Sequence, residues 1–149
     1  MSGLEVAGVV IGALPLVISA LEHYAKGVNT AKRYWRFKTE LRSLILQIST
    51  ERGIFVNTLE QLLTGIVRTE HMAELISDSQ SDTWRMSDVD KKLKDRLRDA
   101  YDVYLDNMKG MEVALKMIGE KLALDPNGKV SSPVLWERNL FYASQEHCL

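Results

Sequence analysis

The side chains with the greatest chemical potential in this 149-residue sequence are three histidines and one cysteine. Each histidine directly follows a glutamate, at Glu22-His23, Glu70-His71 and Glu146-His147. Neighbours at i and i+1 point apart on a helix, so these pairs do not form facing acid/base or metal partners, and none has the E-x-x-H spacing of di-iron bundles. Cys148 is the single cysteine, which excludes an internal disulfide and fits a reducing compartment.

Sequence motifs for phosphate cradles, dinucleotide binding, nucleophile elbows and zinc proteases are also absent. We therefore predict no catalytic residue, no metal site and no cofactor, and a protein that is not an enzyme.

Basic side chains gather between positions 26 and 42. This stretch has six positive charges and one negative charge, Glu40, with Tyr34, Trp35 and Phe37 interleaved. An anionic leaflet attracts such residues by about 1 kcal/mol each, and aromatic rings suit the headgroup layer. We predict that this patch binds anionic membrane lipids, and a solvated helix face with inward aromatics is the alternative. The net charge of −1 argues against nucleic acid as a partner. The basic residues are Lys26, Lys32, Arg33, Arg36, Lys38 and Arg42.

A charge-free segment precedes the patch, from Val6 to Leu21, with 12 apolar residues in 16 positions. No basic stretch precedes it, so a signal peptide is disfavoured. At a rise of about 1.5 Å per residue the run covers about 24 Å, less than the roughly 30 Å of a bilayer core, and Pro15 is expected to kink it. Its apolar residues surround the helix axis, so the helix must be central in a bundle or covered by a partner.

Two local patterns refine this helix. Ser2 and Glu5 have the spacing of a capping box, which places the helix start almost at Met1. Gly8 and Gly12 form a G-x-x-x-G, which permits close helix packing in a membrane. The alternative is a core helix whose glycines admit a neighbour, and both interpretations can hold in different states.

The rest of the chain carries helical signals throughout. A second helix is expected from about Ala31, with heptad rows from Leu41 and an end at Thr64-Gly65. Thr69 is expected to cap a short helix, and the turn-rich residues 77–83 are expected to form a mobile surface loop. Ser87 to Asp90 resembles a capping box, which starts a last long helix running to about 122. Ser132-Pro133 can start a final helix.

Composition agrees with one ordinary soluble domain, at 46% hydrophobic and 26% charged residues. No convincing period-two strand and no internal repeat is present. The sequence therefore predicts an all-α protein, an antiparallel four- to five-helix bundle with a hydrophobic N-terminal helix, formed by residues 1–149 as a single domain.

The first 24 residues, MSGLEVAGVVIGALPLVISALEHY, resemble the opening of HeLo-like domains, which stand at the N-terminus of fungal cell-death and immune proteins. The resemblance continues through Tyr34-Trp35-Arg36-Phe37 and the long helices. More remotely, the chain is similar to the four-helix bundle of mixed-lineage kinase-like necroptosis proteins.

This resemblance implies a pore-forming effector of fungal innate immunity and incompatibility, cytoplasmic when inactive and at the plasma membrane when active. Such a domain self-associates on a signal from an upstream receptor or an amyloid-signalling partner, and it can be the N-terminal part of a longer protein. The alternative is a non-catalytic interaction module of an immune-receptor-like protein. The implied membrane-inserting residues are Leu4, Val6, Val9, Val10, Ile11, Leu14, Leu16, Val17, Ile18 and Leu21, with Gly8 and Gly12 for helix packing.

Overall fold

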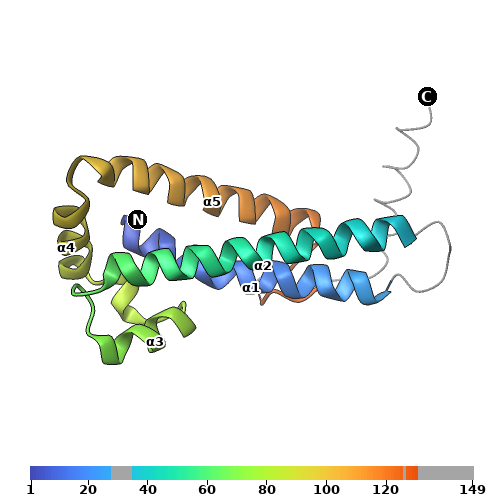
Figure 1. The fold of residues 1–149 in the computed structure, drawn as a ribbon, viewed down its shortest axis with the longest axis horizontal. Coiled ribbons are helices and arrows are strands. Elements are labelled where there is room, and N and C mark those ends of the chain that lie inside the picture. Colours follow the sequence, from blue (N-terminus) through green and yellow to red (C-terminus); the bar gives the residue numbers. More distant parts are fainter. Residues whose placement is uncertain (28–34, 126, 131–149) are drawn as a thin grey trace.

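A computed structural model describes residues 1–27, 35–125 and 127–130 (Figure 1). This part of the chain is helical and contains no strand, which confirms the all-α prediction. The helix α1 spans Gly3–Gly27 without interruption, and Pro15 lies inside it. The start predicted near Met1 is right, and the helix continues past Pro15 to Gly27.

The other helices follow in order. They are α2 (Trp35–Leu63), α3 (Thr69–Ser77), a 3-10 turn η2 (Asp82–Arg85), α4 (Ser87–Leu97), a 3-10 turn η3 (Arg98–Ala100) and α5 (Tyr101–Lys121). The residues proposed to begin the second helix and the whole final helix from Ser132 lie outside the described residues.

The helices α2 and α5 run along α1, and α4 lies across the end of the molecule where α1 begins (Figure 1). Two apolar clusters fill the space between them. The first joins Leu4 and Ile11 of α1 to Leu63 of α2, with Trp84 and Leu93. The second continues along α1, from Val10 to Ala25, and meets the opposite ends of α2 and α5. Thus α1 supplies side chains to both halves of the core.

The C-terminal end of α2 was predicted correctly at Thr64-Gly65. Gly65 has φ +82°, a left-handed conformation that glycine adopts without a Cβ penalty. Arg96 of α4 donates its guanidinium N–H to the carbonyls of Leu62 at 2.7 Å and Thr64 at 2.5 Å. A cation on the last carbonyls of a helix stabilises that end, so α4 and α2 are joined here.

The single long helix predicted from Ser87 to about Leu122 is wrong. The chain breaks at η3, where Arg98 has φ +48°, and α4 turns away from α5. The physical reason is the place where α1 begins, because its first turn contacts Tyr101 at the start of α5. A helix continuing straight beyond Tyr101 would leave Val89 and Leu93 without a core, while the break folds them over the end of α1.

Helix capping follows the sequence at one site and departs from it at two others. Ser2 accepts the Glu5 amide at 3.1 Å, as the first half of the predicted capping box requires. Thr69 does not cap α3, because the helix already includes it and the preceding Arg68 makes no side-chain capping bond. The box at Ser87 does not form either. Ser87 is already inside α4, the capping position is held by Met86, and the Asp90 carboxylate binds the Leu4 amide of α1 instead.

The predicted loop at residues 77–83 carries more structure than expected. Ser81 accepts the Thr83 amide at the start of η2, and Trp84, which follows, is only 2% exposed. Its indole Nε1 donates to the Asp78 carbonyl at 3.0 Å. This segment therefore anchors a core side chain against α1.

Glycines let that tryptophan approach α1. A Cβ added to Gly8 would lie 2.8 Å from Trp84 Cγ, and one added to Gly12 would lie 2.6 Å from Ser79 Oγ. The two glycines of the G-x-x-x-G thus admit the segment 79–84 in the folded bundle. Their role in packing helices within a membrane stays a prediction.

We expect Gly8→Ala to lower the free energy of unfolding by about 1–3 kcal/mol, because its methyl group overlaps the buried ring of Trp84. Gly53→Ala on α2 is the matched control, since nothing lies within 4 Å of an added Cβ. It should instead stabilise the protein by about 0.5–1 kcal/mol through helix propensity. Urea unfolding followed by circular dichroism measures both, and equal effects would contradict the packing assigned to Gly8.

Candidate functional site

Within the part of the chain that the structure describes, one face of α1 stays partly exposed. Val9 and Leu16 are each 40% exposed, and Ala13 between them is half-buried. Their spacing places all three on the same side of the helix. We call Val9, Ala13 and Leu16 the open face of α1.

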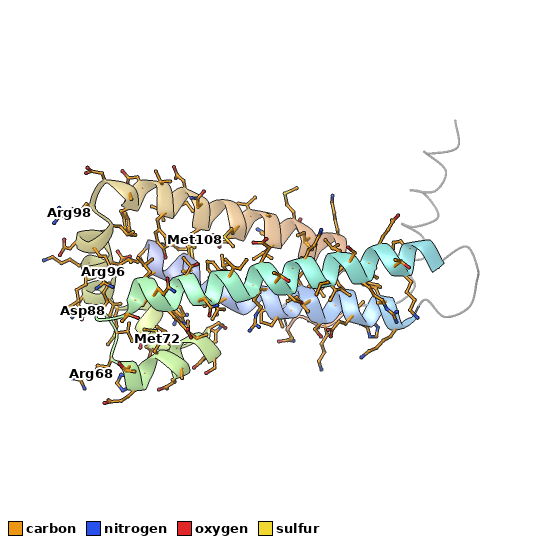
Figure 2. The ribbon with its side chains drawn as sticks, in the orientation of Figure 1. Arg68, Met72, Asp88, Arg96, Arg98 and Met108 are labelled. Atoms are coloured by element: carbon orange, nitrogen blue, oxygen red, sulfur yellow. The ribbon has the colours of Figure 1, made fainter. Side chains whose placement is uncertain are left out.

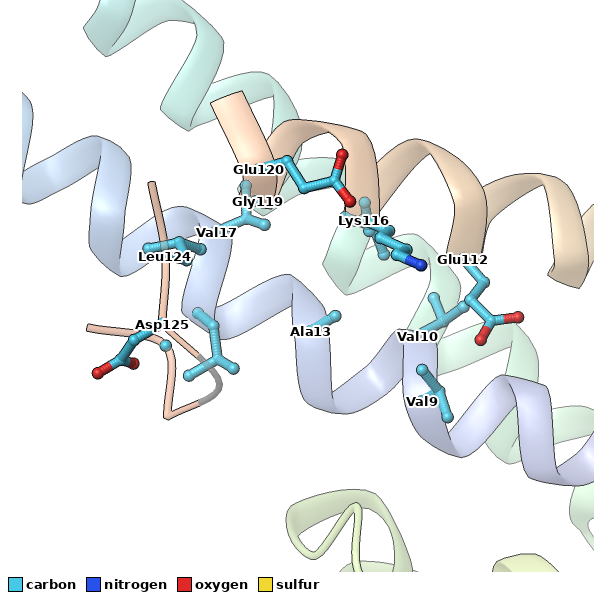
Figure 3. Close-up of a pocket in the computed structure, with 13 residues that line it drawn as sticks. Val9, Val10, Ala13, Val17, Glu112, Lys116, Gly119, Glu120, Leu124 and Asp125 are labelled. Carbon is cyan, nitrogen blue, oxygen red and sulfur yellow. The ribbon is translucent and has the colours of Figure 1, made fainter. Parts of the chain in front are cut away.

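Grooves flank this open face on both sides. The first, of about 420 Å³, lies between α1 and α5 and is bordered by Glu112, Lys116 and Glu120 (Figure 3). Beyond α5 the chain returns over α1 at Leu124, and Gly128 lies against Leu16. The second groove, of about 320 Å³, lies on the other side and includes residues from Ser79 to Arg85.

The ten residues predicted to enter a membrane have very different surroundings in this state. Only Val9 and Leu16 are exposed, and Ile18 is half-buried. The other seven are buried in the two clusters or beside them: Leu4, Val6, Val10, Ile11, Leu14, Val17 and Leu21. The folded protein therefore hides most of the apolar helix and exposes one narrow face of it.

The predicted basic patch is brought together in part. Lys26 at the end of α1, with Lys38 and Arg42 near the start of α2, borders a hollow of about 480 Å³. Lys26 and Arg42 are exposed, Lys38 is half-buried, and Glu22 also lines the hollow. Lys32, Arg33 and the side chain of Arg36 lie outside the described residues. This end of the molecule is opposite to α4, where Arg68, Arg96 and Arg98 lie (Figure 2).

The two histidines that the structure describes, His23 and His71, lie on different helices. His23 is exposed, with its ring 6.2 Å from the ring of Tyr24 in an edge-on arrangement, and His71 is exposed on α3. His147 and Cys148 lie outside the described residues. Within residues 1–27, 35–125 and 127–130, no three His, Cys, Asp or Glu side chains meet in a way that could hold a metal ion.

A buried polar cluster at the start of α1 was not anticipated. Asp90 is 5% exposed, and its Oδ1 accepts the Leu4 amide at 3.3 Å and the Tyr101 hydroxyl at 3.0 Å. The Tyr101 hydroxyl in turn accepts the Gly3 amide at 3.0 Å, and Tyr104 donates to the Gly3 carbonyl at 3.1 Å. Two of the four unpaired amides of this helix end are thus satisfied by α4 and α5.

Lys94 completes the cluster from its solvent side. Its Nζ lies 3.3 Å from Asp90 Oδ2 and 5.1 Å from the centre of the Tyr101 ring. The hydrogen bond to Asp90 and the charges of the cluster raise the pKa of Lys94. Burial raises the pKa of both Tyr101 and Tyr104, and the nearby Asp90 charge adds to that rise. Lys94, Tyr101 and Tyr104 therefore keep the protons that their hydrogen bonds use.

The opposite end of α1 has a simpler attachment. The Tyr24 hydroxyl donates to the Leu122 carbonyl at 2.6 Å, just beyond the end of α5. Burial raises the pKa of Tyr24 as well. Polar bonds to α5 or its end therefore hold α1 near both of its ends, and apolar contacts hold the middle.

Comparison with known proteins gives no match for this chain, neither to a protein-family model, nor to a curated protein, nor to a solved structure.

The tyrosines predict how stability changes in alkali. Because burial raises the pKa of Tyr104 above 10.0, the unfolded chain releases this proton at a lower pH than the folded chain does. The contribution is complete below about pH 10 and declines above it, by at most about 1.4 kcal/mol per pH unit for one tyrosine. Tyr24 and Tyr101 act in the same direction.

We expect Tyr104→Phe to flatten this decline, measured by urea unfolding between pH 9 and 11. At neutral pH the same variant should lose about 1 kcal/mol, for the hydrogen bond to Gly3. An unchanged alkaline slope would contradict the protonated state assigned to Tyr104.

Proposed function

We propose that this protein is a HeLo-like domain, an antiparallel bundle of four to five helices that permeabilises membranes as an effector of fungal cell death. In this proposal the bundle self-associates on an upstream signal, moves from the cytoplasm to the plasma membrane and inserts α1. The observation that carries the proposal is the placement of α1. It is the one described helix long and apolar enough to cross a membrane, and it has an open face.

The length of α1 supports this role better than its charge-free run did. At about 1.5 Å per residue, 25 helical residues extend about 37 Å, whereas a bilayer core is about 30 Å thick. The charge-free run from Val6 to Leu21 covers only about 24 Å, but the helix continues beyond it at both ends. Lys26 then lies at the end of the helix, where a cation can reach the headgroup layer.

Burial within the bundle explains how such a helix is carried in water. In its most apolar 18-residue window, 56% of residues are buried by the other helices. A core helix of a soluble protein has the same property, so burial alone does not favour membrane insertion. The open face and the basic hollow at the end of α1 are the features that a purely structural core helix does not require.

Vesicle leakage tests the proposal directly. The full chain, fused to an inducible dimerising domain, should release dye from phosphatidylserine-containing vesicles and not from neutral ones. Leu16→Asp should reduce leakage about 100-fold, because an aspartate near the centre of a membrane helix costs about 2.5–3.5 kcal/mol.

Ile54→Asp on α2 is the matched control for this substitution. Ile54 is 55% exposed, so an aspartate there disturbs the folded state no more than one at Leu16, and leakage should be retained. Wild-type oligomers that leave anionic vesicles intact, or equal leakage by the two variants, would overturn the proposal.

The basic hollow generates a separate prediction. Replacing Lys26 and Arg42 with glutamine should weaken binding to anionic vesicles about 30-fold, since each cation contributes about 1 kcal/mol near the surface. Lys91 and Lys92, exposed on α4, provide the matched pair for the control. Co-sedimentation at low and high salt measures both, and equal loss in the two double variants would remove the hollow from the proposal.

A non-catalytic interaction module is the second candidate, favoured by the burial of α1 on most sides. Hydrogen exchange with anionic vesicles present separates the two. Persistent protection of residues 6–21 supports the interaction module, and loss of that protection together with transfer to the vesicle supports the effector.

A further inference from the structure

The first turn of α1 is held by hydrogen bonds to distant parts of the chain. At the first turn, the Gly3 and Leu4 amides donate to Tyr101 and Asp90, which are 98 and 86 residues away in sequence. The local cap from Ser2 satisfies only the Glu5 amide. The start of α1 therefore depends on tertiary partners for hydrogen bonds that a freely standing helix obtains from water.

The Asp90 carboxylate depends equally on α1. It is almost fully buried, and each of its hydrogen bonds comes from α1, from Tyr101 or from Lys94 on its own helix. No buried side-chain polar atom lacks a partner within the described residues. Removing one partner therefore leaves a buried carboxylate with fewer compensating bonds, which costs more than the loss of an exposed hydrogen bond.

Close packing fixes the position of this end. A Cβ on Gly3 would lie 2.8 Å from Tyr104 Cε1 and 3.1 Å from the Tyr101 hydroxyl. The helix end thus fits between the two tyrosines without room for a side chain. Close packing, hydrogen bonds and the buried Asp90 charge therefore all hold the first turn of α1.

We propose that Asp90, Tyr101 and Tyr104 form a polar clasp that retains the N-terminal half of α1 in the bundle, and that opening this clasp is the step that frees α1. The clasp itself concerns the folded protein in water, while its part in activation rests on the proposed membrane function. Asp90, Tyr101 and Tyr104 are positioning residues here, because they act through α1.

Native-state hydrogen exchange of the full chain without lipid tests the clasp. Asp90→Asn keeps the size of the side chain and removes its charge, and it should raise exchange of the amides of residues 6–14 about tenfold. Amides of α5 from 108 to 118 should change less than threefold. Asp88→Asn is the matched control, because Asp88 is the other acidic residue in the first turn of α4, is exposed, and lies at that end of the molecule (Figure 2).

Tyr101→Phe keeps the test valid where Asp90→Asn does not fold. It removes the hydroxyl that joins Gly3 to Asp90 and retains the ring. Tyr24→Phe is its control, since that change removes a hydroxyl bond at the other end of α1 and should leave residues 6–14 protected. Equal loss of protection in α1 and α5, or no change in α1, would overturn the clasp.

Leakage from phosphatidylserine vesicles tests the link to activation. The clasp variants should release dye about tenfold faster than wild type at equal concentration, and Asp88→Asn should not. Faster exchange of α1 with no leakage by any oligomerised form would overturn the membrane function and retain the clasp. Leakage by wild type without any effect of the clasp variants would overturn the clasp and retain the membrane function.

Discussion

An apolar helix without a polar side is the constraint on which this fold depends. The helix α1 cannot lie on the surface of a soluble protein, so the other helices are arranged to cover it. Each of them is amphipathic and contributes one face, as Leu59 and Leu63 do from α2 and Met108 and Leu115 from α5. Because Gly8 and Gly12 have no side chain, the segment 79–84 can pack directly against α1 and cover one side of it. The open face lies where none of the described helices covers α1.

Polar groups determine how α1 is oriented within that cover. The hydrophobic effect itself has no direction, so the orientation of α1 depends on close contacts such as those at Gly8 and Gly12 and on polar bonds. The bonds from Gly3 and Leu4 to the clasp, together with Tyr24 to Leu122, fix both its position along the bundle and its rotation. One buried carboxylate, Asp90, links α1, α4 and α5 at the same point.

Periodicity predicted the parts of the fold that depend on local pattern. The apolar residues of α2 face the core in the rows that the heptads from Leu41 indicate, and the helix ends at Thr64-Gly65 as predicted. The role of Asp90 was not predictable in this way, because its spacing from Ser87 satisfies a local capping pattern equally well. Asp90 binds the start of α1 and not its own helix end, because the buried amides of α1 need a partner.

The site was predictable to a similar degree. Composition indicated that α1 would need cover, but a helix apolar on every side carries no information about which side stays open. Val9 and Leu16 are as apolar as Val10 and Val17, and only the positions of α5 and the segment 79–84 separate the exposed pair from the buried pair. The break at Arg98 depends in the same way on where α1 begins.

The proposed transfer of α1 to a bilayer is decided by groups that a bilayer does not replace. Hydrocarbon removes apolar side chains from water as well as the bundle does, so Leu14 or Val17 favours neither state strongly. The clasp, the Tyr24 bond and the glycine contacts exist only in the bundle. Departure of α1 also exposes Leu63, Leu93 and Leu115 to water, at about 1.5–3 kcal/mol for each leucine. Covering those side chains again requires other copies of the chain, and so under this proposal insertion and self-association occur together.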